Sequence, residues 1–215
     1  MPLLDALRSR GPAPRGLPVL LAGALACAAC GDAGTPDPAA SARQGDLPTV
    51  IDLEGERVEA SALAGTHGTV FLFVMSDCPV SNRYAPEVAR LDAAYASLGI
   101  EFVLVYADPV DTPERIREHV TAFAYPCAVV LDPEHALLAH TGATMTPEAA
   151  VFAADGTFVY RGRIDDRTVD YGQVRREPTQ RDLQDVLDAL VAGHAPAFRS
   201  TKAVGCFIPE LEERG

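Results

Sequence analysis

Cys78 is the residue of this 215-residue chain that is best placed to carry out chemistry. It follows the apolar run Thr69–Met75 and stands directly before Pro79, where a segment with helical periodicity begins. Backbone amides and the dipole at a helix N-terminus stabilise an anion, so a cysteine there has a lowered pKa and more reactive thiolate. Proline fits the first helical turn because no amide donor is needed there. The alternative is an unreactive, packed side chain, the common fate of a free cysteine.

Two further segments carry residues that could act with this thiol. Thr146-Pro147 directly precedes the apolar strand Ala149–Ala153, and an X-Pro bond at the entry to a strand is a candidate for the cis form. Cys206 lies in a short apolar patch of the tail, where Gly205 permits a close backbone approach. We predict that this patch docks onto the domain. Cys206 could then pair with Cys78, pack as a simple tail residue, or pair with another chain, because connectivity does not follow from sequence.

The other titratable residues indicate structural roles. Cys127 opens the apolar segment Ala128–Leu131, a position typical of a packed cysteine. The five histidines are scattered without the spacing of a zinc site, and neither a metal nor a cofactor is expected. Asp165, Asp166 and Asp170 lack the spacing of a calcium-binding loop, so we expect a solvated acidic loop there.

The elements that must position these residues alternate between strand and helix. In chain order we expect a hairpin within Thr49–Leu63, a strand Thr69–Met75, a helix Pro79–Leu98, a strand Ile100–Ala107, a helix Thr112–Phe123, a strand Ala128–Leu131, a short helix Asp132–His140, a hairpin of Ala149–Ala153 with Phe158–Arg163, and a helix Gln180–Ala192. This order predicts an α/β protein, a three-layer α/β/α sandwich. Its mixed central sheet would carry a C-terminal edge hairpin and helix.

Composition limits the partners of the protein. Hydrophobic residues make up 48% of the chain, which is enough for a sizeable core. The formal net charge is −12. A surface that acidic argues against nucleic acid and anionic membrane surfaces as binding partners.

The N-terminus has the pattern of an export signal. Three arginines precede the apolar run Leu17–Cys30, which is too short for a membrane-spanning helix. A small residue directly before Cys30 resembles a bacterial lipobox, in which the cysteine is lipidated, and Cys27 is the alternative position. An ordinary cleaved signal with incidental cysteines is the other interpretation. A lipid anchor would place the protein in the bacterial cell envelope, attached to the membrane and facing the periplasm or exterior, where disulfides are permitted.

These features predict four segments. They are a lipoprotein signal peptide at 1–30, a flexible tether at 31–46 that is rich in small and polar residues, a folded domain at 47–194, and a tail at 195–215 that carries Cys206.

The stretch from about Leu47 to Ala192 resembles the thioredoxin-like superfamily. It is most similar to the redoxin group, which includes the alkyl hydroperoxide reductase/thiol-specific antioxidant family and the membrane-anchored cytochrome-biogenesis redoxins. Cys78 falls on the nucleophilic cysteine of the family, and Thr146-Pro147 falls on its cis-proline loop. The hairpin Ala150–Gly162 is similar to the family's edge hairpin. The resemblance implies a thioredoxin fold and thiol chemistry at Cys78.

Three departures from the family pattern bear on activity. Ser81 stands where a thioredoxin has its second cysteine, although its hydroxyl could donate a hydrogen bond to the thiolate. Met75 stands where a peroxiredoxin has threonine, so the donor that orients a peroxide is missing or is replaced by Ser76. The cysteines four residues apart that a copper-chaperone redoxin needs are also absent from the sequence.

The sequence thus predicts an extracytoplasmic thiol-disulfide oxidoreductase that acts on protein thiols or disulfides. Cys78 would be the nucleophile, and Cys206 or an external thiol would resolve the mixed disulfide. Ser81 and the Thr146-Pro147 loop would orient the reacting groups. The alternatives are a thiol peroxidase that reduces a hydroperoxide, a non-enzymatic binding or assembly module with a structural disulfide, and a metal site formed by Cys78 with a histidine.

Overall fold

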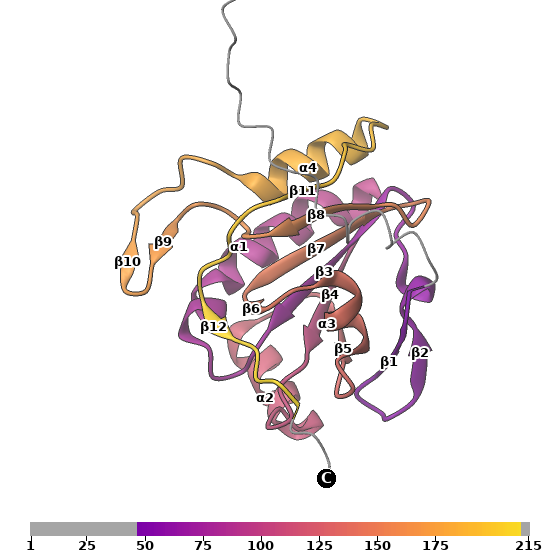
Figure 1. The fold of residues 1–215 in the computed structure, drawn as a ribbon, viewed down its shortest axis with the longest axis vertical. Coiled ribbons are helices and arrows are strands. Elements are labelled where there is room, and N and C mark those ends of the chain that lie inside the picture. Colours follow the sequence, from indigo (N-terminus) through magenta and orange to yellow (C-terminus); the bar gives the residue numbers. More distant parts are fainter. Residues whose placement is uncertain (1–46, 212–215) are drawn as a thin grey trace, which may run out of the picture. The chain divides into compact units, whose positions relative to one another are not determined.

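The computed structural model describes residues 47–211. These residues form a domain built on a mixed sheet of eight strands (Figure 1). The elements are β1 Thr49–Ile51, β2 Arg57–Glu59, η1 Ala60–Leu63, β3 Gly68–Val74, α1 Pro79–Tyr95, η2 Ala96–Leu98, β4 Ile100–Tyr106, α2 Pro113–Phe123, β5 Ala128–Leu131, α3 Ala136–Thr141, β6 Met145–Thr146, β7 Glu148–Ala153, β8 Phe158–Gly162, β9 Thr168–Asp170, β10 Gln173–Val174, α4 Asp182–Val191, β11 Arg199–Ser200 and β12 Cys206–Phe207.

The strand order of the large sheet is β11-β8-β7-β3-β4-β5-β1-β2. The central strands β3, β4 and β5 run parallel to one another, and β7 and β8 are antiparallel to their neighbours on the other side of β3. Since parallel strands require crossover connections, α1 joins β3 to β4 and α2 joins β4 to β5. This topology is the mixed sheet that the alternating strand and helix pattern predicts.

Strand β3 is buried on both faces because its side chains serve two cores. Val70, Leu72 and Val74 belong to one hydrophobic cluster, whereas Phe71 and Phe73 belong to a second. Period-two alternation therefore distributes a continuous apolar run over the two faces of the sheet.

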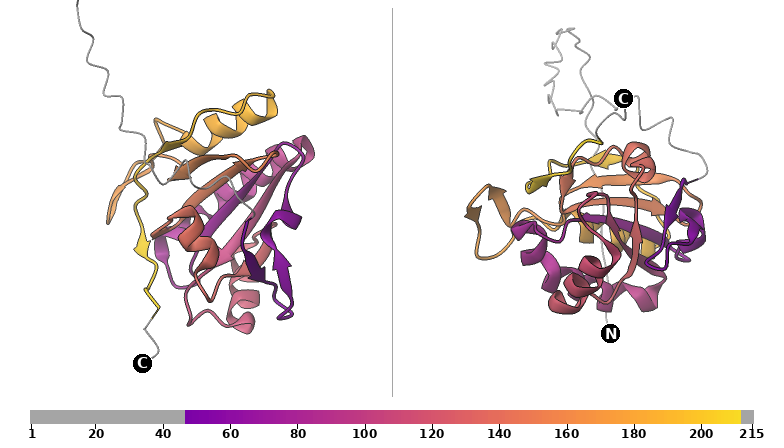
Figure 2. Two further views of the ribbon diagram at one scale, coloured as in Figure 1. Left: turned by 45° about the vertical axis from the view of Figure 1, so that its right-hand side comes forward. Right: turned by 90° about the horizontal axis from the view of Figure 1, so that it is seen from below.

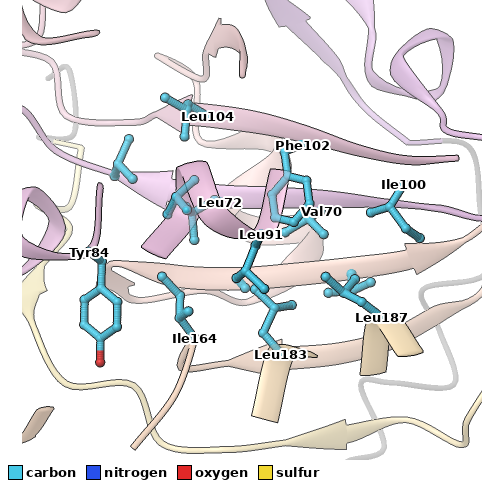
Figure 3. Close-up of a cluster of buried hydrophobic side chains, with 14 of the residues drawn as sticks. Val70, Leu72, Tyr84, Leu91, Ile100, Phe102, Leu104, Ile164, Leu183 and Leu187 are labelled. Atoms are coloured by element: carbon cyan, nitrogen blue, oxygen red, sulfur yellow. The ribbon is translucent and has the colours of Figure 1, made fainter. Parts of the chain in front are cut away.

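Helices cover both faces and complete three layers (Figure 2). Side chains of α1 and α4 pack against the first face, where Leu91, Leu183 and Leu187 point toward Val70 and Leu72 (Figure 3). The short helix α3 contributes to the second core, on the opposite face. The α/β/α sandwich is therefore confirmed.

The boundaries of the expected elements agree closely with the structure. Helix α2 begins after Thr112, whose side chain accepts a hydrogen bond from the backbone of Arg115, with Pro113 at its first position. Helix α1 ends at Tyr95, where a short 3₁₀ turn carries the segment to Leu98. Helix α3 starts four residues later than expected, because His135 adopts a left-handed backbone conformation directly before it.

The expectation of a solvated acidic loop is wrong for two of its three aspartates. Asp165 and Asp166 are 1% and 4% exposed, and only Asp170 faces solvent. The hydroxyl of Tyr84 in α1 donates to Asp165 at 2.6 Å, and the Arg167 side chain forms an ion pair with it at 3.4 Å. Buried carboxylates need such partners, since an unpaired buried charge is costly.

Asp166 closes the base of a small hairpin, β9–β10, that the sequence pattern missed. Its carboxylate accepts from the backbone N–H groups of Thr179 and Gln180 at 2.6 and 2.9 Å, and it pairs with Arg175. Burial would raise the pKa of Asp166, but these donors and the Arg175 cation lower it to about 2. The acidic loop is thus a structural junction that fixes the hairpin.

The tail supplies two short strands. β11 adds in parallel to β8 at the edge of the large sheet, and β12 pairs antiparallel with β6. No helix within residues 47–211 has the length and apolar character needed to cross a membrane. The expected signal peptide, tether and lipidation sites at Cys27 and Cys30 lie outside the described residues, and the segment boundaries stay predictions.

Candidate thiol site

Cys78 lies at the junction of β3 and α1, at the N-cap position of the helix. Its backbone is extended, and its amide donates to the carbonyl of Met75 at 3.2 Å. Its carbonyl accepts the first helical hydrogen bond, from the amide of Asn82, at 3.0 Å. Pro79 occupies the first helical position, as its ring and missing amide favour. The sulfur is therefore held where helix amides point outward.

The cis-proline loop supplies the opposite wall of the site. The Thr146-Pro147 peptide bond is cis, as the sequence suggested. The Cys78 thiol donates to the backbone carbonyl of Thr146 at 3.2 Å, across 68 residues of sequence. On the helix side, the backbone amide of Ser81 donates to the Cys78 sulfur at 3.4 Å. The Cys78 sulfur is thus held between the first turn of α1 and β6.

The tail brings Cys206 to the same place. β12 pairs with β6 so that Cys206 stands opposite Thr146 and Phe207 opposite Met145. Gly205 makes this approach possible, since a Cβ atom there would lie 1.9 Å from the carbonyl oxygen of Thr146. The docking predicted for the apolar tail patch is therefore present. It places Cys206 opposite Thr146, whose carbonyl accepts from the Cys78 thiol, so the two cysteines are neighbours.

The pKa values of the two thiols are shifted in opposite directions. Burial would raise the pKa of Cys78, but hydrogen bonds from the Cys206 and Thr146 side chains and from Ser81 lower it below the ordinary thiol value. Burial, together with the hydrogen bond and charge of Cys78, raises the pKa of Cys206 to about 12. The pair therefore loses its first proton at Cys78, and Cys206 keeps its proton and donates to the thiolate.

Ser81 contributes through both its backbone and its side chain. The residue is fully buried, and its hydroxyl makes no hydrogen bond in the structure although it acts to lower the pKa of Cys78. A buried hydroxyl without a fixed partner retains a donor that a thiolate can accept. The replacement of the second thioredoxin cysteine by serine is thus compatible with thiolate stabilisation.

Behind the thiol, a buried network fixes the loop that leads into α1. The Asn82 side-chain amide donates to the carbonyl of Ser76 at 3.1 Å, and its oxygen lies 2.7 Å from Nε2 of His119. The Tyr106 hydroxyl lies 2.7 Å from the other ring nitrogen of His119. Burial lowers the pKa of His119, so the neutral ring is favoured. The sequence pattern does not reveal this network, because its members come from three separate elements.

Ser76, the possible replacement for the peroxiredoxin threonine, points elsewhere. Its hydroxyl donates to the carboxylate of Asp111 and accepts from the Arg115 guanidinium at 2.8 Å. Its amide also donates to Asp111 at 3.2 Å. These partners hold Ser76 to the start of α2, so its hydroxyl is already engaged away from the Cys78 sulfur.

Cys127 has the properties expected of a packed cysteine. It is partly buried against the first core cluster, directly before β5. Burial, reinforced by the charges of Asp92 and Glu101, raises its pKa to about 12. The thiol stays protonated near neutral pH and is a poor nucleophile there.

The fold and the thiol at a helix N-terminus beside a cis-proline define a thioredoxin-like protein, and comparison with known proteins agrees. The family model described as Redoxin matches residues 33–183. The chain belongs to the Redoxin family. No curated protein matches the sequence.

Solved structures support the fold. An uncharacterised conserved protein from Geobacillus kaustophilus aligns with a TM-score of 0.67 at 23% identity, over 80% of this chain and 93% of that one. A hypothetical protein from Sinorhizobium meliloti aligns with a TM-score of 0.65 at 22% identity, over 77% and 91%. The thioredoxin domain of a thiol-disulfide oxidoreductase from Bacteroides vulgatus aligns with a TM-score of 0.51 at 16% identity, over 69% and 96%.

Proposed function

We propose that this protein is a thiol-disulfide oxidoreductase of the cell envelope, with Cys78 as nucleophile and Cys206 as resolving thiol. The observation that carries the proposal is the pair of thiols itself. Cys206 contacts Cys78 from a distant segment, and the pKa of Cys78 is lowered while that of Cys206 is raised. A nucleophile must be a thiolate, whereas a resolving thiol can stay protonated until its turn comes.

The reaction has two exchange steps. The Cys78 thiolate attacks one sulfur of a partner disulfide, forming a Cys78–partner disulfide and releasing the other partner sulfur as a thiolate. Cys206 then loses its proton and attacks the Cys78 sulfur, which releases the second partner thiolate and leaves a Cys78–Cys206 disulfide. The two thiol protons of the protein end on the partner, whose disulfide is reduced by two electrons. The reverse sequence oxidises a dithiol partner.

Two groups are proposed to orient these steps. Ser81 lies at the first turn of α1 and donates to the Cys78 sulfur through its amide. The Thr146 carbonyl, presented by the cis peptide bond to Pro147, accepts from the Cys78 thiol. Both contacts support roles for these residues in holding the sulfur between the helix and β6.

Disulfide exchange is favoured over peroxide reduction by the surroundings of Cys78. The Ser76 hydroxyl is engaged by Asp111 and Arg115, so it cannot serve as the missing peroxiredoxin donor without leaving them. An envelope location, with a lipid anchor at Cys30 or Cys27, is part of the proposal because the N-terminal pattern supports it.

Redox titration with glutathione, read by mass spectrometric thiol mapping, tests the proposal. We expect a reversible Cys78–Cys206 disulfide in equilibrium with a physiological range of glutathione, and no turnover of a model disulfide by Cys78→Ser. Cys127→Ser is the matched control and should behave as the unchanged protein. If Cys78 stays reduced with every disulfide tested, the assignment of Cys78 as nucleophile in disulfide exchange is refuted. Consumption of hydrogen peroxide with a sulfenic acid at Cys78 would support a thiol peroxidase instead.

A further inference from the structure

The nucleophile is closed off in the reduced protein. Cys78 has 0% of its surface exposed. The groups that interact with its sulfur come from α1, β6 and β12. An in-line attack on a partner disulfide requires direct contact between sulfurs. Something at this site must therefore move before any macromolecular partner can react.

The segment Lys202–Leu211, here called the strap, brings Cys206 opposite Thr146, whose carbonyl the Cys78 thiol contacts. It runs from β11 past β6 toward the C-terminus (Figures 1 and 2). Its regular pairing is only two residues long, with Cys206 opposite Thr146 and Phe207 opposite Met145. A further bond joins the amide of Ile208 to the carbonyl of Thr144 at 3.1 Å. Helix α1, by contrast, packs against the first core cluster, and β6 is followed after one residue by β7 of the large sheet.

The strap also bridges a hollow. A cavity of about 610 Å³ lies between it and the domain, lined by Glu148 and Arg161 on the domain side and by Lys202, Ala203 and Phe207 on the strap side. Phe207 is 78% exposed despite its size. The strap buries Ala203 and packs Cys206 and Ile208 against the core clusters. Its two-residue pairing and the cavity beside it are nevertheless features of a segment with low local stability.

We propose, building on the function proposed above, that the strap is a redox-locked gate. In the reduced protein, which is closed in the structure, the strap opens transiently, exposes Cys78 and carries Cys206 away, so that a partner disulfide can enter. When Cys206 resolves the mixed disulfide, the new Cys78–Cys206 bond ties the strap down covalently. The oxidised protein therefore holds the gate closed, and reduction of the bond frees it.

Gly205 gives a way to loosen the gate without touching either sulfur. In Gly205→Ala the added methyl would lie 1.9 Å from the Thr146 carbonyl oxygen and 2.7 Å from its carbon. Both are backbone atoms, so the strap has to shift away from β6. The matched control is Glu210→Ala, an exposed position further along the same strap.

The first test measures alkylation of Cys78 by iodoacetamide in the reduced, full-length protein, resolved by peptide from Cys206 and Cys127. We expect Cys78 to react far more slowly than in urea, and Gly205→Ala to accelerate it at least about tenfold, since two or three strap hydrogen bonds are lost. Glu210→Ala should leave the rate unchanged, and circular dichroism checks that each variant is folded. Native Cys78 reacting as fast as in urea would overturn the proposal.

The second test is hydrogen exchange of residues 204–209 in the reduced and oxidised protein, which needs no substitution. We expect exchange in the oxidised protein to be slower by at least about tenfold, because the disulfide prevents opening. Strap amides that exchange as slowly as those of β3 in the reduced protein would also overturn the gate. If no Cys78–Cys206 disulfide can be formed, the proposed function fails, yet the alkylation test still decides whether the strap covers Cys78.

Discussion

Replacing Cys206 by serine should trap a mixed disulfide on Cys78, and the structure sets the size of the effect. In the unchanged protein Cys206 stands opposite Thr146, which the Cys78 thiol contacts, so the resolving step is intramolecular. Even a flexibly tethered group has an effective concentration on the order of 10 mM. Against about 10 μM external thiol this is a roughly 1,000-fold advantage over an intermolecular step of the same chemistry.

The high pKa of Cys206 reduces this advantage without removing it. Burial is the first cause of the raised value, and the hydrogen bond and charge of the Cys78 thiolate add to it. Once Cys78 is in a mixed disulfide its charge is gone, so burial and the charge of Asp77 are what still oppose ionisation of Cys206. A less ionised thiol is compensated in part by greater nucleophilicity. With about a tenfold allowance, the Cys78–glutathione disulfide should live on the order of 100-fold longer in Cys206→Ser.

The assay mixes reduced protein with oxidised glutathione, quenches with acid at intervals and quantifies the glutathione adduct on Cys78 by mass spectrometry. Cys127→Ser controls for removal of a thiol as such, because its pKa of about 12 keeps that thiol unreactive. Equal adduct lifetimes in the unchanged protein and in Cys206→Ser would refute the role of Cys206 as resolving thiol. If Cys206→Ser loses the adduct by forming a disulfide between Cys78 and Cys127, the resolving role belongs to Cys127 instead.

Three further outcomes follow from the structure. The pKa of Cys78 is lowered in the folded protein. The free energy of unfolding of the reduced protein should therefore rise with pH between the folded and unfolded pKa values of Cys78. Denaturant titrations at several pH values should find this slope in the unchanged protein and not in Cys78→Ser. Tyr84→Phe should lower the free energy of unfolding by about 2 kcal/mol, since a buried carboxylate loses a donor, whereas Tyr171→Phe at a 73% exposed position should be neutral in the same titrations. Gly162→Ala should lower the melting temperature more than Gly156→Ala does; both have positive φ, but only at Gly162 would the new methyl meet the tail backbone, at 2.4 Å.

The parts of the fold that local pattern determines could be predicted from the sequence. The apolar run that became β3 has only apolar and β-prone residues, and both faces of the strand are buried. The start of α2 followed from Thr112 and Pro113, because capping involves neighbours three residues apart. The site of Cys78 could be placed for the same reason, since the end of a strand and the start of a helix are both local signals.

The remainder depended on contacts between distant residues. β12 consists of two residues, too few for any periodicity, and its partner Thr146 lies 60 residues away. The buried state of Asp165 depends on Tyr84, 81 residues earlier, so the local sequence reads as an exposed acidic loop. The proximity of Cys78 and Cys206 could therefore be stated only as one of several pairings until tertiary structure placed the tail.

The two thiols lie on elements held by different numbers of contacts. In the gate that we propose, this difference lets the strap bury Cys78 and also move away so that Cys78 can react. Cys78 is fixed by the first turn of α1, where the Ser81 amide stabilises its thiolate whether or not the tail is in place. Cys206 is held by a two-residue strand, so its departure breaks few bonds. A pair on a single helical turn could not separate in this way, because both sulfurs would move with the helix. In the gate that we propose, the redox state of the pair determines access to Cys78, since the Cys78–Cys206 disulfide formed on oxidation also holds the strap in place.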